Sequence, residues 1–353
     1  MCLRPEHLSV RHFCFRRCIM KTTILRSILP LLVLQIGCKD TGNFNELHST
    51  QGEWKLVRNS QGGYFQGLWF ADRDNGWAVG DSGRILHTSD AGTSWKVQVS
   101  GTVAPLKSVH FFDSSKGWIG ASNNSIGITT NGGASWSWQQ PTGEPRRTFM
   151  ALSFVNHNLG WVVDNFGGIL HTEDGGTTWT PQTSGTTWAI TSVQFLDANE
   201  GWATATNRVV LHTTNGGNNW IALTLDNIDC GNGVAIFEDI FFSGRSKGWI
   251  CTNVSASSIA NPVASVVYTS DMGSTWVCRP TPESCGIFSI KFIDENVGWA
   301  ASCRGILHTT DNGRTWTYQL QGSDDFFVDL WFVDQSHGWA LTFTGNIYRY
   351  QTL

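Results

Sequence analysis

The sequence repeats one phrase seven times, and this repetition constrains the fold more than any other feature. Each copy holds a Gly-Trp pair and a phenylalanine seven residues before the tryptophan, as in Phe292 and Trp299. The seven tryptophans are Trp77, Trp118, Trp161, Trp202, Trp249, Trp299 and Trp339. A period of about 40 to 50 residues with short strand-like segments is typical of a β-propeller, in which each repeat forms one blade.

Within one repeat the pattern predicts four short antiparallel strands. In the second copy, residues 108–112, 117–121 and 126–130 are rich in β-forming residues and are separated by polar turns, and Trp136 begins a fourth strand. No helical periodicity competes with this pattern after the first 37 residues. We therefore predict an all-β fold, a single seven-bladed β-propeller of four-stranded antiparallel blades.

The seventh copy lacks a fourth strand of its own, because the sequence runs out after Tyr350. A matching segment lies at the other end of the domain. Residues 54–57 resemble the fourth strand that begins at Trp95, and Trp54 precedes Trp95 by 41 residues, an ordinary repeat length. We predict that this N-terminal strand completes the C-terminal blade and closes the ring, which leaves no open sheet edge.

The turn before the fourth strand matches the Asp-box pattern Ser/Thr-x-Asp-x-Gly-x-Ser/Thr-Trp in four copies, and two further copies carry Asn in place of Asp. The six residues at this position are Asp90, Asn131, Asp174, Asn215, Asp271 and Asp311. A short Asp or Asn side chain can accept backbone N–H groups across its own turn. We therefore predict a structural role for these residues rather than a catalytic one.

The N-terminal residues predict an export signal. A basic stretch that starts at Met20 precedes about ten apolar residues, too few to span a membrane permanently, and this stretch ends in Gly37-Cys38. The ending resembles a bacterial lipobox, so we expect a signal peptide over residues 1–37, lipidation of Cys38, a linker over 38–53 and the propeller over 54–353. The predicted location is the cell envelope, with the outer membrane favoured. Secretion without lipidation is the alternative, and the true start could be Met20.

Charge excludes one class of partner and suggests another. Residues 38–353 carry 18 basic and 27 acidic side chains, a net charge of −9, so we expect no nucleic-acid binding. Five arginines fall in loops between second and third strands or between blades, which emerge on one face of a propeller: Arg84, Arg146, Arg147, Arg208 and Arg304. They predict a patch that binds a protein partner, with solvated loop charge as the alternative. Insertions at residues 225–238 and 252–262 favour the same face.

The five cysteines that follow residue 38 allow at most two disulfides and one free thiol. They are Cys230, Cys251, Cys278, Cys285 and Cys303. Strand positions make pairs within a blade geometrically plausible, namely Cys230 with Cys251 and Cys285 with Cys303. Buried thiols are the alternative.

No metal, cofactor or catalytic site is predicted. Four histidines recur at one strand position in separate blades, so they surround the ring instead of converging on one ion. These residues are His87, His171, His212 and His308. A glycosidase needs two opposed carboxylates, and neither these nor an arginine triad with a tyrosine nucleophile is recognisable.

The phrase Phe-x6-Trp followed by Leu-His-Thr-x-Asp-x-Gly-x-Thr-Trp resembles the photosystem II stability/assembly factor family and its non-photosynthetic bacterial relatives, over residues 54–350. The resemblance implies a non-catalytic scaffold that binds another protein, as an assembly or stability factor for an envelope complex. Through the Asp boxes alone the chain also resembles sialidases and xyloglucan-cleaving propellers. That weaker resemblance implies the alternative, a carbohydrate-binding or glycan-cleaving propeller.

Overall fold

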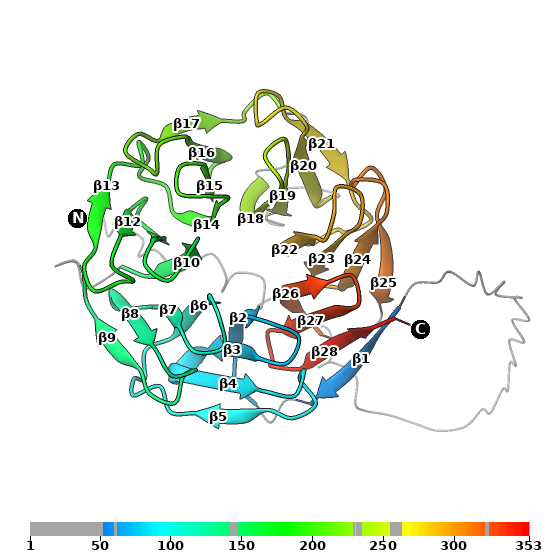
Figure 1. The fold of residues 1–353 in the computed structure, drawn as a ribbon. Coiled ribbons are helices and arrows are strands. Elements are labelled where there is room, and N and C mark those ends of the chain that lie inside the picture. The colour runs from blue at the N-terminus through cyan, green and yellow to red at the C-terminus, as the bar shows by residue number, and fades with distance from the viewer. Residues whose placement is uncertain are drawn as a thin grey trace, which may run out of the picture. The chain divides into compact units, whose positions relative to one another are not determined.

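The computed structural model describes residues 52–59, 62–141, 147–228, 230, 235–254, 263–321 and 325–352. These residues form seven four-stranded antiparallel sheets arranged as the blades of a ring (Figure 1). The predicted seven-bladed propeller is therefore confirmed. The predicted signal peptide, Cys38 and Arg146 lie outside the described residues.

Each blade is numbered here by its Gly-Trp copy; its first strand is innermost and its fourth lies at the perimeter (Figure 1). Blade 1 contains β2 (Phe65–Phe70), β3 (Gly76–Gly80), β4 (Arg84–Thr88) and β5 (Lys96–Gln98). Blade 2 contains β6 (Leu106–Phe111), β7 (Gly117–Ala121), β8 (Ser125–Thr129) and β9 (Ser137–Gln139). Blade 3 contains β10 (Phe149–Phe154), β11 (Gly160–Asp164), β12 (Ile169–Thr172) and β13 (Thr180–Gln182). Blade 4 contains β14 (Ile190–Phe195), β15 (Gly201–Ala205), β16 (Val209–Thr213) and β17 (Ile221–Thr224).

The remaining blades include the three longest strands, β18, β19 and β26, and the closing strand β1. Blade 5 contains β18 (Ala235–Ser243), β19 (Lys247–Val254), β20 (Ser265–Thr269) and β21 (Val277–Pro280). Blade 6 contains β22 (Ile287–Phe292), β23 (Gly298–Ser302), β24 (Gly305–Thr309) and β25 (Thr317–Gln321). Blade 7 contains β26 (Phe327–Asp334), β27 (His337–Thr342), β28 (Ile347–Gln351) and β1 (Glu53–Arg58). Among the described residues the helical element is a 3₁₀ turn, η2 (Asp81–Gly83), and no helix there could cross a membrane.

The ring closes as predicted, because β1 pairs antiparallel with β28 and places Trp54 opposite Tyr350. The Trp54 indole meets the Phe332 ring edge-on at 5.7 Å and donates its Nε1–H to Gln319 Oε1 at 2.9 Å. In blade 1 the Asp-box Trp95 meets Phe70 in the same perpendicular way, at 5.9 Å. Trp54 therefore fills the place that an Asp-box tryptophan fills in the other blades.

The repeated Phe and Trp form the contacts between blades. Each Gly-Trp tryptophan stacks on the repeated phenylalanine of the next blade, with centroid distances from 3.4 Å for Trp161–Phe195 to 4.6 Å for Trp202–Phe242. The series continues through the closure, where Trp339 stacks on Phe70 at 3.5 Å. Such aromatic pairs contribute about 0.5–1.5 kcal/mol each beyond the burial of their surface. The seven-fold repetition of one interface thus explains why these residues define the period.

The glycine before each tryptophan is required by the same phenylalanine. A Cβ atom added to Gly76 would lie 2.3 Å from the Phe70 ring, closer than side chains can approach. The phenylalanine therefore covers the start of the second strand directly, and the Phe-x5-Gly-Trp spacing records that contact.

The described residues contain two disulfides, and one of them differs from its prediction. Cys285 pairs with Cys303, as predicted. The predicted pair of Cys230 with Cys251 is wrong, because Cys230 pairs with Cys278 and Cys251 is a buried free thiol. Strand alternation explains the difference: Cys251 packs with residues of blade 6 such as Ile287, whereas the other two cysteines pack on the blade 4 side of their sheet.

Candidate protein-binding face

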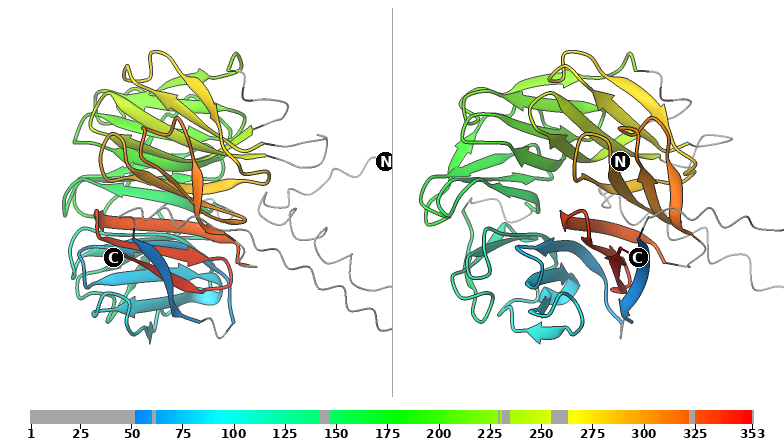
Figure 2. Two further views of the ribbon diagram at one scale, coloured as in Figure 1. Left: turned by 90° about the vertical axis from the view of Figure 1, so that its right-hand side faces the viewer. Right: turned by 45° about the vertical axis from the view of Figure 1, so that its right-hand side comes forward.

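The loops extend from two opposite faces of the ring, which Figure 2 shows from the side. The crossover face carries the turns between second and third strands and the connections between blades, which hydrogen-bond to each other. Asn124 N–H, for example, donates to Arg147 O at 2.7 Å. The Asp-box face carries the Asp boxes and the turns between first and second strands, joined by contacts such as Ala91 N–H to Asp74 O at 3.0 Å. The predicted arginines that the structure describes and the predicted Asp-box residues therefore lie on opposite faces.

The Asp-box side chains bind within their own turns. Asp90 Oδ1 accepts the Ser94 N–H at 2.8 Å and the Thr88 hydroxyl at 2.8 Å, while Oδ2 accepts the Ser94 hydroxyl at 2.6 Å. These hydrogen bonds lower the pKa of Asp90 to about 2. In a degenerate box, Asn131 Oδ1 accepts the Ser135 N–H at 3.0 Å in the same way. An acid held like this is engaged by its turn and is not directed at a substrate.

Four of the five predicted arginines are described, and they spread around the crossover face in blades 1, 3, 4 and 6. Arg84 is exposed and donates to Gly62 O. Arg147 pairs with the buried carboxylate of Asp164. Arg304 is 59% exposed, with its Nε 3.9 Å from a Glu283 oxygen. The described arginines of this face are therefore separate from one another and do not form one compact basic patch. Two of them, Arg147 and Arg304, lie beside carboxylates.

A groove of about 530 Å³ opens on the crossover face between blades 3 and 4. Its walls come from the β11–β12 turn and from the connection between β13 and β14. Phe166 and Trp188, from these two segments, are 53% and 49% exposed, and Arg147 completes the wall. Exposed aromatic side chains beside an arginine are the composition that dominates binding energy in protein interfaces.

A second aromatic group lies on the same face at the ring closure. Tyr64 stacks on Phe343 at 4.6 Å, Phe343 meets Phe326 at 6.4 Å, and Phe326 meets Phe288 at 4.7 Å. Tyr64 is 46% exposed. The crossover face therefore carries exposed aromatic rings at two places. Arg147 lies beside the first, and Arg84, which donates to Gly62 O, lies beside Tyr64 in the second.

Sequence reasoning missed Phe166 and Trp188, although a signal for Trp188 existed. Fourteen of the 18 tryptophans occupy the two repeated positions, and the others are Trp69, Trp138, Trp188 and Trp331. Of these four, Trp188 is the one that is about half exposed. A tryptophan outside the repeat was the available clue, but its exposure depends on loop conformation.

Three charged side chains on the inner strands connect four consecutive blades, namely blades 5, 6, 7 and 1. Lys291 Nζ on β22 lies 3.0 Å from Asp239 Oδ2 on β18. On β26, Asp329 Oδ2 accepts the Leu68 N–H of blade 1 at 2.8 Å. Burial raises the pKa of Asp329 to about 6, which the positive charge of Lys291 partly opposes. Both carboxylates accept backbone hydrogen bonds from the neighbouring blade, so they serve the blade interfaces.

The four repeated histidines do not converge. Each packs against the tryptophan of its own blade; His87 stacks on Trp77 and His171 on Trp161, both at 4.8 Å. Burial lowers the pKa of His87 and His171, and it lowers the pKa of His308 to about 4.

A second hollow, of about 670 Å³, lies beside His171 and Asp174 and is lined mainly by polar side chains.

The family model for the photosynthesis system II assembly factor YCF48 matches two overlapping stretches, residues 97–181 and 133–276, which together span just over half of the chain. No protein with a curated description matches. Among solved structures, "YCF48 bound to D1 peptide" is 20% identical, covers 85% of this chain and 97% of its own, and superposes with a TM-score of 0.68. YCF48 from Cyanidioschyzon merolae is 18% identical over 85% of this chain and 99% of its own, with a TM-score of 0.69.

The propeller fold is also shared with enzymes. The GH74 enzyme from Niastella koreensis is 13% identical over 85% of this chain but only 53% of its own length, with a TM-score of 0.64. At such identities, the likeness to solved structures establishes the fold alone.

Proposed function

This chain belongs to the photosynthesis system II assembly factor YCF48 family, and on that premise we propose that it is a non-catalytic scaffold that binds another protein through its crossover face. The observation that carries the proposal is the groove between blades 3 and 4, where Phe166, Trp188 and Arg147 surround one opening. A family member whose structure was solved holds a D1 peptide, which supports a peptide segment as the kind of ligand.

The groove suggests the chemistry of that segment. The two rings offer apolar contact area that loses little rotamer entropy, and Arg147 offers a guanidinium at one wall. We expect an extended segment with an apolar side chain and a carboxylate. Because Arg147 already pairs with Asp164, the remaining arginines of the face would act at longer range, steering an acidic partner.

We further propose that the scaffold is exported, anchored in the envelope through a lipid on Cys38, and that it assists the assembly or stability of an envelope complex. The lipobox-like ending of residues 34–38 supports this placement. Replacing Cys38 with Ala should move the protein from the membrane fraction to the soluble fraction. Unchanged membrane association would contradict the anchor.

A photo-crosslinking experiment tests the binding face. A benzophenone amino acid replaces Phe166 in one strain and Phe112 in another. Phe112 is a matched control, since it is 41% exposed but lies at the end of β6 on the Asp-box face. We expect ultraviolet-dependent protein adducts from position 166 and none from position 112. Adducts at 112 alone, or at neither position, would contradict the proposal.

The alternative, a carbohydrate-binding or glycan-cleaving propeller, is favoured by one observation: half-exposed rings such as Trp188 can also stack on sugars. A glycan array and a broad glycosidase screen distinguish the two functions. Loss of glycan binding on Trp188→Ala would support the alternative, whereas an inactive wild-type protein in both assays would reject it.

A further inference from the structure

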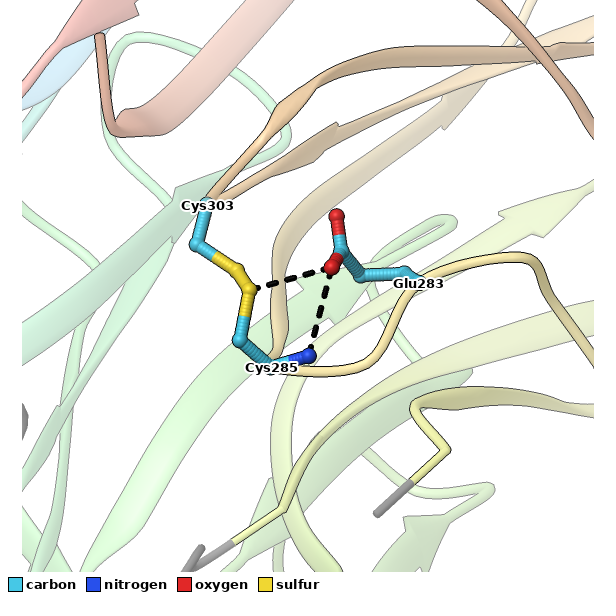
Figure 3. A group of neighbouring side chains, drawn as sticks. All are labelled: Glu283, Cys285 and Cys303. Atoms are coloured by element: carbon cyan, nitrogen blue, oxygen red, sulfur yellow. Dashed lines mark hydrogen bonds between the residues drawn. A yellow bond between two sulfur atoms is a disulfide. The ribbon is translucent and has the colours of Figure 1, made fainter. Parts of the chain in front are cut away.

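Two sulfurs and one carboxylate meet at the crossover end of blade 6, away from the groove. Glu283 and Cys285 lie in the connection between β21 and β22, and Cys303 lies in the turn between β23 and β24. The cysteines form a disulfide with a Cα–Cα distance of 6.3 Å. Figure 3 shows the Glu283 carboxylate directed at the sulfur bridge, with Oε1 3.0 Å from Cys285 Sγ.

The carboxylate is held in place by its surroundings. Glu283 Oε1 accepts the Ser284 N–H at 2.7 Å and the Cys285 N–H at 3.2 Å. The other oxygen accepts the Tyr318 hydroxyl at 3.0 Å. The Glu283 side chain is 0% exposed. These contacts fix a buried acid against sulfur before any ligand arrives.

The disulfide does not stabilise the buried Glu283 carboxylate. Its sulfur has no proton to donate, so the contact at 3.0 Å adds no hydrogen bond, while burial of a carboxylate carries a desolvation cost. Structural linkage of the two strands does not need the acid. In reduced form, the arrangement instead offers two thiolates and a carboxylate, each a donor type that Zn²⁺ accepts.

We propose that the reduced form of this site binds a thiophilic divalent cation of the Zn²⁺ type through Cys285 Sγ, Cys303 Sγ and the Glu283 carboxylate. The three ligand atoms all lie within 4.8 Å of one another. That spread lets one ion reach each of them at the usual distances of about 2.3 Å to sulfur and about 2.1 Å to oxygen, once the sulfurs separate. Because both cysteines are partly exposed, solvent takes the fourth position.

The chemistry balances in two steps. An external dithiol gives two electrons and two protons to the S–S bond, which becomes two thiols, and the dithiol is oxidised to its own disulfide. The cation then replaces both thiol protons, which pass to solvent, and the carboxylate completes the three protein ligands. The oxidised protein, in which the sulfurs are bonded to each other, provides no thiolate and does not bind the ion.

Arg304 balances the charge of the complex. Three anionic ligands around a doubly charged cation leave one net negative charge. The Arg304 guanidinium has its Nε 3.9 Å from Glu283 Oε1 and is 59% exposed, so it neutralises that charge without entering the ligand sphere. The redox state of blade 6 therefore decides whether a covalent bond or an ion joins the segments at Cys285 and Cys303.

Cobalt titration of the full chain tests the site. The protein is reduced, freed of reductant without oxygen, and titrated with Co²⁺. We expect one equivalent to bind, with a sulfur-to-cobalt charge-transfer band and the intense visible bands of tetrahedral cobalt, and we expect Zn²⁺ to displace it. The oxidised protein should show neither band. Absence of a stoichiometric sulfur-to-cobalt signal in the reduced protein would overturn the proposal.

Variants assign the ligands. Cys303→Ser should abolish the charge-transfer signal, and Cys285→Ser provides a second test should the first variant fail to fold. The matched control is Cys230→Ser with Cys278→Ser, which removes the other disulfide and should still bind one equivalent. Glu283→Gln should keep a band from two sulfurs but weaken affinity at least tenfold. An unchanged affinity in Glu283→Gln, or a full signal in Cys303→Ser, would refute the three-ligand site.

Discussion

At the scale of single residues, the Asp-box position requires a side-chain oxygen acceptor but not a negative charge. Asp90 and Asn131 accept the same backbone N–H across the same turn, although one is charged and the other neutral. The oxygen acceptor is common to both, so the acceptor rather than the charge holds the turn. This explains why the sequence tolerates Asn in two of the six boxes.

That reasoning predicts an order of effects at position 90. Asp90→Asn should lower the thermal midpoint slightly, because only the charge-dependent part of the hydrogen bonding is lost, whereas Asp90→Ala should lower it further, by a few degrees, because the Ser94 and Thr88 groups lose their acceptor. Differential scanning calorimetry at pH 7 measures both. The pKa of Asp90 is lowered to about 2, so its charge-dependent contribution is present above about pH 4 and is lost as the pH falls through about 2. Equal losses for Asn and Ala would contradict the acceptor argument.

Asp329 predicts the opposite pH dependence. Its pKa is raised from 3.8 to about 6 in the folded protein, so the folded state binds the proton more tightly than the unfolded state. The associated stability is fully present below about pH 4 and is lost as the pH rises through about 6.

Asp329→Asn keeps an oxygen that can accept the Leu68 N–H but cannot ionise. The variant should therefore gain stability relative to the wild type as the pH rises from 4 to 7. Urea midpoints at four pH values in this range measure the difference between the two proteins. A constant difference across the range would show that Asp329 does not titrate as described.

At the scale of elements, the positions of the strands could be predicted from the sequence. The side of the sheet on which each residue lies could not, because it depends on strand register. In blades 1 to 4 and 6 the first strand ends at the repeated phenylalanine, the second begins at the glycine of the Gly-Trp pair and the third ends at the Asp-box threonine. These repeated residues therefore locate the strands directly from sequence. In every first strand, however, the register to the second strand shifts near its start, as between Phe65 and Gly67 in blade 1. No repeated residue type marks that shift, since Gln66, Lys107 and Met150 occupy it in blades 1 to 3.

The same limit explains the cysteine and groove results. Cys230 and Cys251 were paired by blade, but the side of the sheet on which each lies decides the partner, and that depends on strand register. The groove likewise depends on how the loops at Phe166 and Trp188 turn outward, which the repeat does not encode. Strand order predicted the face of the ring on which these loops emerge, and the structure added the residues that line the groove.

The closing strand gives the clearest prediction at this scale. Trp54→Ala removes a side chain that is 8% exposed and contacts Phe332 and Tyr350. We expect a loss of about 3–5 kcal/mol in unfolding free energy, measured by urea denaturation. Lys55→Ala, an exposed position of the same strand, is the control and should have almost no effect. Similar losses for both variants would contradict the closure by Trp54.

At the scale of the whole molecule, the ring places two kinds of loop on opposite faces. The Asp-box face holds the blades' own turns, and the crossover face carries the arginines and the exposed rings of the groove. A rigid framework that fixes variable loops on one side is how a propeller presents a binding surface. We therefore propose that partners dock on the crossover face.

Charge reversal on each face tests that claim most directly. One variant carries Arg84→Glu, Arg208→Glu and Arg304→Glu; the matched variant carries Arg73→Glu, Arg245→Glu and Arg314→Glu, from exposed positions on the Asp-box face. Arg147 is left intact because it pairs with the buried Asp164.

The measurement is quantitative crosslinking of partners in the native cell, with folding of each variant verified by circular dichroism. We predict that the crossover-face variant loses the partners captured by the wild type, because steering and rim contacts are reversed in sign, while the Asp-box-face variant retains them. Equal retention by both variants, at unchanged salt sensitivity, or loss only in the Asp-box-face variant, would contradict docking on the crossover face.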